Sequence, residues 1–309
     1  MDAKELALVT LGRSLREAGY RFVTVTPTTH RRVLARPEEQ QTLRSIFGWN
    51  RPFQRDALAP HLLELLSQAG ALAQIGEGYR STVRFASIGD MVFAHSPFPT
   101  VEADAVFFGP DTYRFVRLVR AAIADPPLKS DLVLVDVGAG SGAGGLCAAR
   151  LLPEDAKIVL ADINARALAF SAVNAAINDV QSARAVFSDV LAGVEGEPDL
   201  IIANPPYLVD QQERLYRHGG GNLGISLAAR IATDGLARLA PGGRLVLYTG
   251  TPIIAGIDPF FEFLEPLLKL HCSQFIYEEI DPDVFGEELE GRPYAGVDRI
   301  AAVGVIAVK

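Results

Sequence analysis

The chain has little cysteine, few histidines and no long hydrophobic run, although hydrophobic residues make up 49% of its 309 residues. Its two cysteines, Cys147 and Cys272, are far apart and fit no metal-ligand spacing, so neither a disulfide framework nor a zinc site is expected. The histidines are scattered, and only His218 falls in a loop near the expected substrate side. No run of about 18 apolar residues is present, unlike in a membrane span. We therefore expect a soluble, cytoplasmic protein of about two domains, without metal or membrane contact.

Charge is unevenly distributed along the chain. Residues 1–100 carry 12 Lys and Arg against 9 Asp and Glu, whereas residues 101–309 carry 17 against 28, and the net charge is −8. The small basic excess is compatible with an anionic partner for the N-terminal third, but it is well below the footprint of a strong nucleic-acid-binding domain. A solvated surface explains it equally well.

From about residue 128 the sequence alternates between strand-like and helix-like segments. Near-continuous Val, Ile and Leu runs occur at 132–137, 157–163, 183–189, 199–206 and 243–250, with amphipathic segments between them. Buried strands that alternate with helices indicate an α/β fold with a parallel sheet covered on both faces. An apolar helix and two strand-like segments complete the chain, at 260–270, 272–280 and 299–308.

The first 100 residues have a different pattern. Helical segments at about 4–18 and 58–70 precede extended pieces at 72–75 and 79–87, which Gly76-Glu77-Gly78 joins as in a hairpin. Helices followed by a hairpin predict a mainly helical, winged-helix-like module that recognises the substrate. The sequence therefore divides into this domain, residues 1–100, and an α/β domain, residues 101–309.

A glycine-rich loop, DVGAGSGAGG at 136–145, connects the first strand of the second domain to a helix. Glycines allow a sharp turn and bring a ligand close to the backbone, and a helix N-terminus offers N–H groups to an anion. Gly138, Gly140 and Ala143 also satisfy the dinucleotide fingerprint. Glycine spacing alone therefore leaves a nicotinamide dehydrogenase open.

Acidic residues end three successive strands of the predicted sheet: Asp136, Asp162 and Asp189. Because the carboxyl ends of parallel strands meet at one edge, these side chains are expected to line one crevice. Each acid has a structural alternative, as a solvated strand terminus or as a helix N-cap.

With these features the chain resembles the class I S-adenosylmethionine (SAM)-dependent methyltransferases, whose first motif is D-x-G-x-G-x-G. The resemblance implies SAM as cofactor and a Rossmann-like, seven-stranded domain whose sheet closes with an antiparallel hairpin. It implies cofactor contacts for the following residues: Thr112, Asp136, Gly138, Ala139, Gly140, Gly142, Asp162, Ile163, Asp189, Val190 and Asn204. The glycines would flank the methionine part, Asp162 the ribose, and Asp189 with Val190 the adenine.

The fourth strand ends in Asn204-Pro205-Pro206-Tyr207, which faces the same crevice and supplies the predicted catalytic residues. As a turn, two prolines after a strand are ordinary, because proline cannot donate to a sheet ladder. As a site, the tetrapeptide suits a planar NH2 group, which is a weak nucleophile because its lone pair is delocalised. The Asn204 oxygen and a proline carbonyl can accept both N–H hydrogens and favour a pyramidal nitrogen, while Tyr207 offers a stacking face.

N-P-P-Y makes the likeness more specific, because it is typical of amino-group methyltransferases and of the glutamine methyltransferases that act on translation release factors. The segments 107–116 and 216–232 also resemble that family and its methyltransferase small domain. Three features depart from it: the GNLGIS stretch, Tyr113 in place of a second acid, and the winged-helix-like N-terminal module. These departures concern the substrate.

Two acceptors of the methyl group stay open. The first is a glutamine side-chain amide in a protein such as a translation release factor, and the second is an exocyclic amine of adenine or guanine in RNA or DNA. Base methylation would require Tyr207, Tyr113 and Phe108 to face the crevice. The intact Asn204 argues against a non-catalytic SAM- or nucleotide-binding scaffold, and N-P-P-Y has no role in a dehydrogenase.

Overall fold

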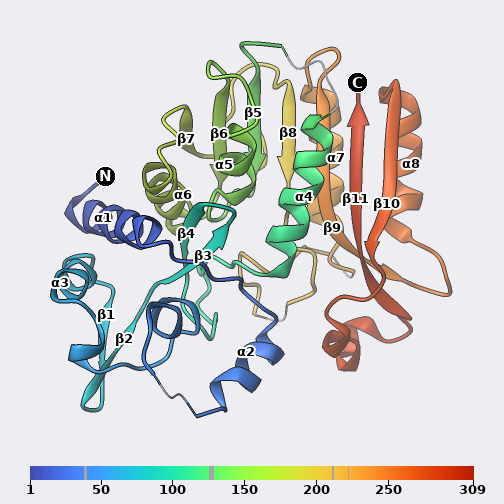
Figure 1. The fold of residues 1–309 in the computed structure, drawn as a ribbon. Coiled ribbons are helices and arrows are strands. Elements are labelled where there is room, and N and C mark those ends of the chain that lie inside the picture. The colour runs from blue at the N-terminus through green and yellow to red at the C-terminus, as the bar shows by residue number, and fades with distance from the viewer. Residues whose placement is uncertain (38–39, 125–128, 211, 222) are drawn as a thin grey trace.

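The computed structural model describes residues 1–37, 40–124, 129–210, 212–221 and 223–309, and its main element is a seven-stranded sheet (Figure 1). The strand order is β10-β11-β9-β8-β5-β6-β7. The strands are β5 (Val133–Val137), β6 (Lys157–Asp162), β7 (Ala183–Phe187), β8 (Leu200–Ala203), β9 (Arg244–Ile253), β10 (Gln274–Asp281) and β11 (Arg299–Val308). Strands β5 to β9 pair in parallel, while β11 is antiparallel to both β9 and β10. The predicted seven-stranded α/β fold with a closing antiparallel hairpin is confirmed.

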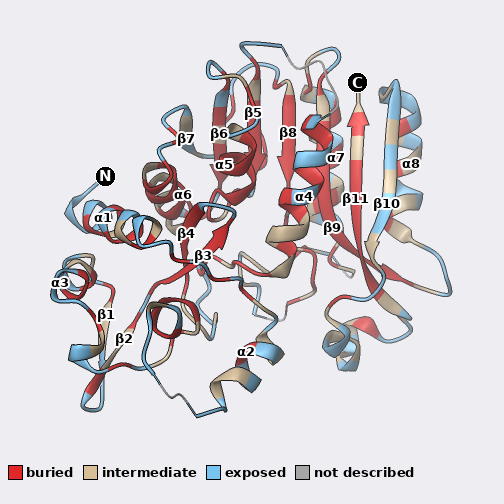
Figure 2. Ribbon diagram, viewed as in Figure 1, coloured by how far each residue is buried: buried red, intermediate tan, exposed pale blue. Residues whose placement is uncertain are grey.

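Helices cover both faces of this sheet. Helices α4 (Pro110–Ala124) and α5 (Ala143–Ala149) pack on one face, and α7 (Ser226–Arg238) and α8 (Pro259–His271) pack on the other. Successive side chains of a strand point to opposite faces, so Leu200 and Ile202 of β8 join the first core, whereas Ile201 and Ala203 join the second. Both faces of the sheet are therefore buried, as the central strands in Figure 2 show. This burial accounts for the apolar runs in the sequence.

The N-terminal region is mainly helical, as expected, and ends in two hairpins. Its elements are α1 (Ala3–Glu17), α2 (Pro27–Leu34), the π-helical η1 (Arg44–Gly48), the 3₁₀ turn η2 (Arg55–Ala57), α3 (Pro60–Gln68), β1 (Leu72–Ile75), β2 (Gly78–Ser81), β3 (Arg84–Ile88) and β4 (Met91–His95). The extended piece predicted at 79–87 is interrupted, because Ser81 Oγ donates to the carbonyl of Val83 and accepts its N–H. This local turn ends the β1–β2 hairpin and lets β3 and β4 form another.

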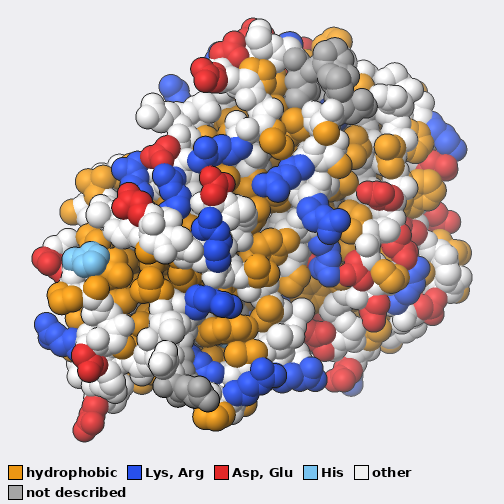
Figure 3. Space-filling model, in the orientation of Figure 1, with side chains coloured by type: hydrophobic (Ala, Val, Ile, Leu, Met, Phe, Trp, Pro, Cys, Tyr) orange, Lys and Arg blue, Asp and Glu red, His pale blue; other side chains and the backbone are white. Residues whose placement is uncertain are grey.

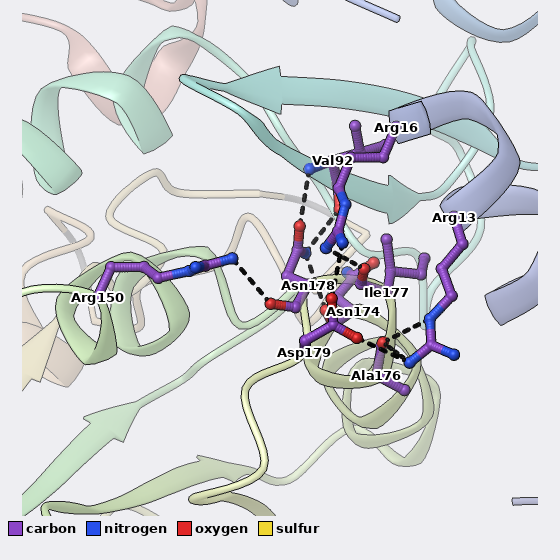
Figure 4. Close-up of polar contacts among 9 residues, drawn as sticks. All are labelled: Arg13, Arg16, Val92, Arg150, Asn174, Ala176, Ile177, Asn178 and Asp179. Atoms are coloured by element: carbon purple, nitrogen blue, oxygen red, sulfur yellow. Dashed lines mark hydrogen bonds and ion pairs between the residues drawn. The ribbon is translucent and has the colours of Figure 1, made fainter. Parts of the chain in front are cut away.

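Helix α6 (Ala165–Ile177) connects the N-terminal region to the sheet. Arg13 and Arg16 of α1 point at the C-terminal end of α6, where they donate to the carbonyls of Ala176 and Ile177 and both pair with Asp179 (Figure 4). Cationic side chains are favourable there because the last carbonyls of a helix lack partners.

Two buried asparagines, Asn174 of α6 and its C-cap Asn178, complete this contact by pairing with the backbone of β4. Asn178 accepts the Val92 N–H at 3.0 Å and donates to the Val92 carbonyl at 2.8 Å (Figure 4). Asn174 does the same with Ala94, at 2.7 and 2.9 Å, and also donates to the carbonyl of Ser141 in the glycine loop. Asn174 thereby links β4 of the N-terminal region to the loop predicted to hold the cofactor.

The hydrophobic core of the N-terminal region is continuous with α6. Leu11 and Leu15 of α1 cluster with Phe170 and Ile177, and a Cβ on Gly12 would lie 2.3 Å from Ile177 Cδ1, so α1 lies very close to α6. The division into residues 1–100 and 101–309 stays a prediction. Within the described residues, no helix combines the length and the apolar character needed to cross a lipid bilayer.

Candidate active site

A cavity at the carboxyl edge of the parallel strands collects nearly all the residues predicted for the site. Of the predicted cofactor contacts and catalytic residues, its lining contains Thr112, Asp136, Gly138, Ala139, Gly140, Asp162, Ile163, Asp189, Val190, Asn204, Pro205, Pro206 and Tyr207. Gly142 lies outside this lining and begins α5 in the left-handed conformation, with φ 77°. The strand ends therefore converge as expected, while the roles of the individual residues stay predictions.

The glycine loop leaves free space beside its backbone. Gly138 has φ 70° and Gly140 has φ 57°, a region that favours glycine. The N–H groups of Gly138 and Ala139 donate to the carbonyl of Ala161 at 2.8 and 3.0 Å, which ties the loop to β6. Among the described residues, no heavy atom beyond its chain neighbours lies within 4 Å of where a Cβ on Gly138 would stand. Because Gly138 lines the cavity, a ligand can approach its backbone closely.

Two buried acids organise this loop and give the cavity an acidic wall. Asp136 accepts the Gly145 N–H at 2.7 Å, and Asp162 accepts the N–H groups of Gly140 and Asn164 at 2.9 and 2.8 Å. Burial raises the pKa of Asp136 to about 7 and also raises the pKa of Asp162. In the described part of the chain neither carboxylate contacts a Lys, Arg or His side chain. This wall therefore fits a cationic ligand such as SAM, which carries a sulfonium and an ammonium group.

Asp189 differs from the other two acids because its carboxylate is exposed and already paired. Both of its oxygens accept from Arg230 of α7, at 2.8 and 2.9 Å. The next residue, Val190, is buried with φ 53°. The adenine contact predicted for Asp189 and Val190 stays a prediction, and Arg230 is a partner that the sequence did not reveal.

The tetrapeptide after β8 lines the same cavity as the glycine loop, which follows the neighbouring strand β5. Asn204 is half-buried, and its neighbour Pro205 is buried. Tyr207 is buried too, and its hydroxyl donates to Asp111 at 2.7 Å. The stacking role predicted for Tyr207 stays a prediction, and the contact with Asp111 is one that the sequence did not indicate.

Some of the aromatic residues that line the cavity differ from those expected. Phe107 and Tyr216 both line it and stack on each other, with ring centroids 6.0 Å apart and ring planes 13° from parallel. Phe108 instead stacks on buried His95, and the Tyr113 hydroxyl accepts the N–H of Thr24 at 3.0 Å. The expectation that Phe108 and Tyr113 face the crevice in a base methyltransferase is therefore not met. Phe107 and Tyr216 lie in irregular segments, where no periodicity shows which side chain points inward.

Comparisons with known proteins show similarity to methyltransferases. Residues 126–253 match the family model described as methyltransferase small domain. A release factor glutamine methyltransferase of Lactococcus lactis is 24% identical over 72% of this chain and 82% of its own length. One of Deinococcus radiodurans is 32% identical over 37% of this chain and 44% of its length. A ribosomal RNA small subunit methyltransferase C of Pasteurella multocida is 28% identical over 48% of this chain and 39% of its length.

Among solved structures, the Thermus thermophilus 16S rRNA N2 G1207 methyltransferase in complex with AdoMet and guanosine aligns with a TM-score of 0.47 and 20% identity. The alignment covers 81% of this chain and 61% of that one. The chain thus spans most of the Lactococcus lactis relative, and less than half of the Deinococcus radiodurans and Pasteurella multocida relatives.

Proposed function

We propose that this chain, a SAM-dependent methyltransferase with a methyltransferase small domain, methylates the nitrogen of a planar NH2 group. The observation that carries the proposal is the position of Asn204-Pro205-Pro206 on the same cavity as Gly138, Asp136 and Asp162. A donor held against the glycine loop and the acidic wall would then face an acceptor held by the tetrapeptide.

Asn204 and Pro205 activate the acceptor by hydrogen bonding. The Asn204 side-chain oxygen and the Pro205 carbonyl each accept one N–H of the NH2 group, which draws the lone pair out of the π system and aims it into the cavity. Bound SAM supplies a methyl carbon attached to a positively charged sulfur. SAM held beside Gly138 and Asp162 would supply this methyl carbon, its S–C bond breaking as the N–C bond forms, and the nitrogen would then release one proton to water. No strong general base is needed, because the proton leaves after the methyl group has been transferred.

A glutamine side-chain amide in a protein is the first candidate acceptor. Release factor glutamine methyltransferases are among the relatives, and one of them is matched over 82% of its length. The segments 107–116 and 216–232 also resemble that family, and both border the cavity here through Phe107 and Tyr216. A translation release factor is accordingly the first protein to test.

An exocyclic amine of adenine or guanine in RNA or DNA is the second candidate, and the stacked pair of Phe107 and Tyr216 favours it. Flat bases bind well against aromatic rings beside such a site. Figure 3 shows Lys and Arg side chains over α2 and α4, and Arg31, Arg32 and Arg117 of these helices are exposed. Exposed arginines on the face of the molecule seen in Figure 3 suit a phosphate backbone.

The deciding experiment uses SAM with a labelled methyl group and an extract from cells that lack this gene. Protein of wild-type sequence and the Asn204→Ala variant are incubated in parallel, and the products are digested separately with protease and with nuclease. Label released only by protease supports the glutamine acceptor, and label released only by nuclease supports the base amine. Absence of wild-type label above the variant contradicts the proposal. Tyr216→Ala adds a check, because it should reduce base methylation much more than glutamine methylation.

A further inference from the structure

Tyr207 is enclosed by close contacts on its ring and on its backbone. A Cβ on Gly250 of β9 would lie 2.1 Å from the Tyr207 ring, so the ring rests directly on this strand. The edge of Phe285 meets the ring at 69° with centroids 5.9 Å apart. The ring is therefore fixed against the sheet.

Gly219 and Gly224 pack against the backbone of the same residue. A Cβ on Gly219 would stand 2.7 Å from Tyr207 Cα, and a Cβ on Gly224 would stand 2.2 Å from the Tyr207 carbonyl oxygen. The Gly219 N–H also donates to the carbonyl of Leu208 at 2.8 Å. Because glycine has no Cβ, Gly219 and Gly224 can pack closely on Tyr207. This close packing is a physical reason for glycine at these two positions.

The hydroxyl of Tyr207 is fixed by a buried carboxylate. Asp111, in the first turn of α4, accepts from Tyr207 on one oxygen at 2.7 Å and from Tyr248 on the other at 2.8 Å. Arg114 donates to Asp111 at 2.9 Å and to Asp281 at 2.6 Å, so α4 also binds the end of β10. Burial raises the pKa of Tyr207 far above its usual value, and the nearby charge of Asp111 raises it further. The phenol therefore keeps its proton at neutral pH and donates it in the hydrogen bond.

We propose that Asp111 is a positioning residue for methyl transfer, acting through the Tyr207 hydroxyl to hold Asn204 and Pro205 at the distance and angle that the reaction needs. The inference rests on the proposed function. Tyr207 is three residues from Asn204, and two of those steps are prolines with restricted backbones, so a displacement of Tyr207 is transmitted to the acceptor groups. Most of the predicted cofactor contacts lie on the glycine loop and on the ends of β6 and β7, so SAM affinity is expected to change less than the rate.

The test compares Tyr207→Phe with Tyr277→Phe. Both changes delete one hydroxyl that donates to an aspartate, but Tyr277 bonds Asp258 at 2.6 Å at the start of α8, and neither Tyr277 nor Asp258 lines the cavity. We expect Tyr207→Phe to lower kcat by about tenfold or more, since small misplacements of reacting groups cost this much or more. The KM for the acceptor and the affinity for SAM should change less than the rate, and Tyr277→Phe should match the wild-type protein.

Asp111→Asn provides a second variant, because it replaces one of two oxygens that each accept from a different tyrosine with an NH2 group, which can only donate. It should lower kcat as Tyr207→Phe does. The acceptor is the labelled fraction from the extract, used at several dilutions, and SAM affinity is measured by calorimetry. A wild-type rate in Tyr207→Phe, or an equal loss in Tyr277→Phe, overturns the positioning role. Absence of transfer by the wild-type protein would instead contradict the proposed function, so the two failures are distinguishable.

Discussion

Buried acids beside the glycine loop combine a structural and a chemical role. Asp136 bonds the Gly145 N–H, and Asp162 bonds the Gly140 N–H, so each carboxylate shapes the loop as well as facing the cavity. The sequence predicted these acids because they end parallel strands, and the carboxyl ends of parallel strands meet at one edge of the sheet. For Asp111, the resemblance of segment 107–116 implied an acid near the cofactor and the substrate, but the sequence did not predict its hydrogen bonds, because the two tyrosine partners lie far along the chain.

Stability should decrease with pH through Asp136. Burial raises its pKa in the folded protein to about 7, above that of the unfolded chain, so the folded state holds an extra proton between about pH 4 and pH 7. The stabilisation is complete below the unfolded pKa and is lost as pH rises through the folded pKa. The amide introduced by Asp136→Asn can still accept the Gly145 N–H but cannot ionise, so this part of the pH dependence should disappear. Urea unfolding of both proteins at pH 5 and pH 8 measures this difference. If the free energy of unfolding changes equally with pH in both proteins, the assignment is contradicted.

Removal of the Asp162 carboxylate should weaken SAM binding. Asp162→Ala deletes the proposed ribose contact and also leaves the N–H groups of Gly140 and Asn164 without this acceptor. We expect the Kd for SAM to rise about tenfold or more, since a lost hydrogen bond to a charged group costs about 1.5–3 kcal/mol. Isothermal titration calorimetry gives the value directly. Unchanged affinity would exclude Asp162 from the cofactor site.

At the scale of elements, the parallel sheet was predictable and the N-terminal contacts were not. Strand β5 occupies 133–137, where the sequence predicted 132–137, and α1 occupies 3–17, where it predicted about 4–18. Both predictions hold because strand composition indicates β5 and apolar periodicity indicates α1. The pairing of α6 with β4 has no such signal. It depends on Asn174 and Asn178. In the sequence these asparagines cannot be told from polar residues on an exposed helix face, whereas the fold buries both.

The α6–β4 contact should contribute strongly to stability. Asn174→Ala removes the partners of the Ala94 N–H and carbonyl and of the Ser141 carbonyl in a buried position. Because an unsatisfied buried group costs about 1–3 kcal/mol, we expect the free energy of unfolding to fall by roughly 2–4 kcal/mol. Asp179→Ala is the control, since its ion pairs with Arg13 and Arg16 are half-exposed and should contribute at most about 1 kcal/mol. A similar decrease in the free energy of unfolding in both variants would contradict the expectation that the Asn174 hydrogen bonds contribute more than the Asp179 ion pairs.

For the whole molecule, the N-terminal region is joined to the sheet domain by a shared core and by hydrogen bonds from β4 to Asn174, which also donates to the glycine loop. The sequence separated the two parts by composition, and it could not show that α1 and β4 pack on α6. Such contacts join segments about 80 to 170 residues apart, and local patterns do not encode them. For the same reason the sequence predicted that Asn204-Pro205-Pro206-Tyr207 lines the site, but it did not predict the Phe107–Tyr216 pair on the same cavity.

The central claim is that Asn204 activates a planar NH2 group for transfer of the SAM methyl group. The most direct measurement is the rate of labelled methyl transfer by the wild-type protein and by Asn204→Ala, at saturating SAM, with SAM affinity determined on the same samples. Loss of one preorganised group at a reacting centre costs about 10²–10³ in rate, so we expect Asn204→Ala to lose most methyl transfer while it keeps its SAM affinity. A normal rate in Asn204→Ala would contradict the account.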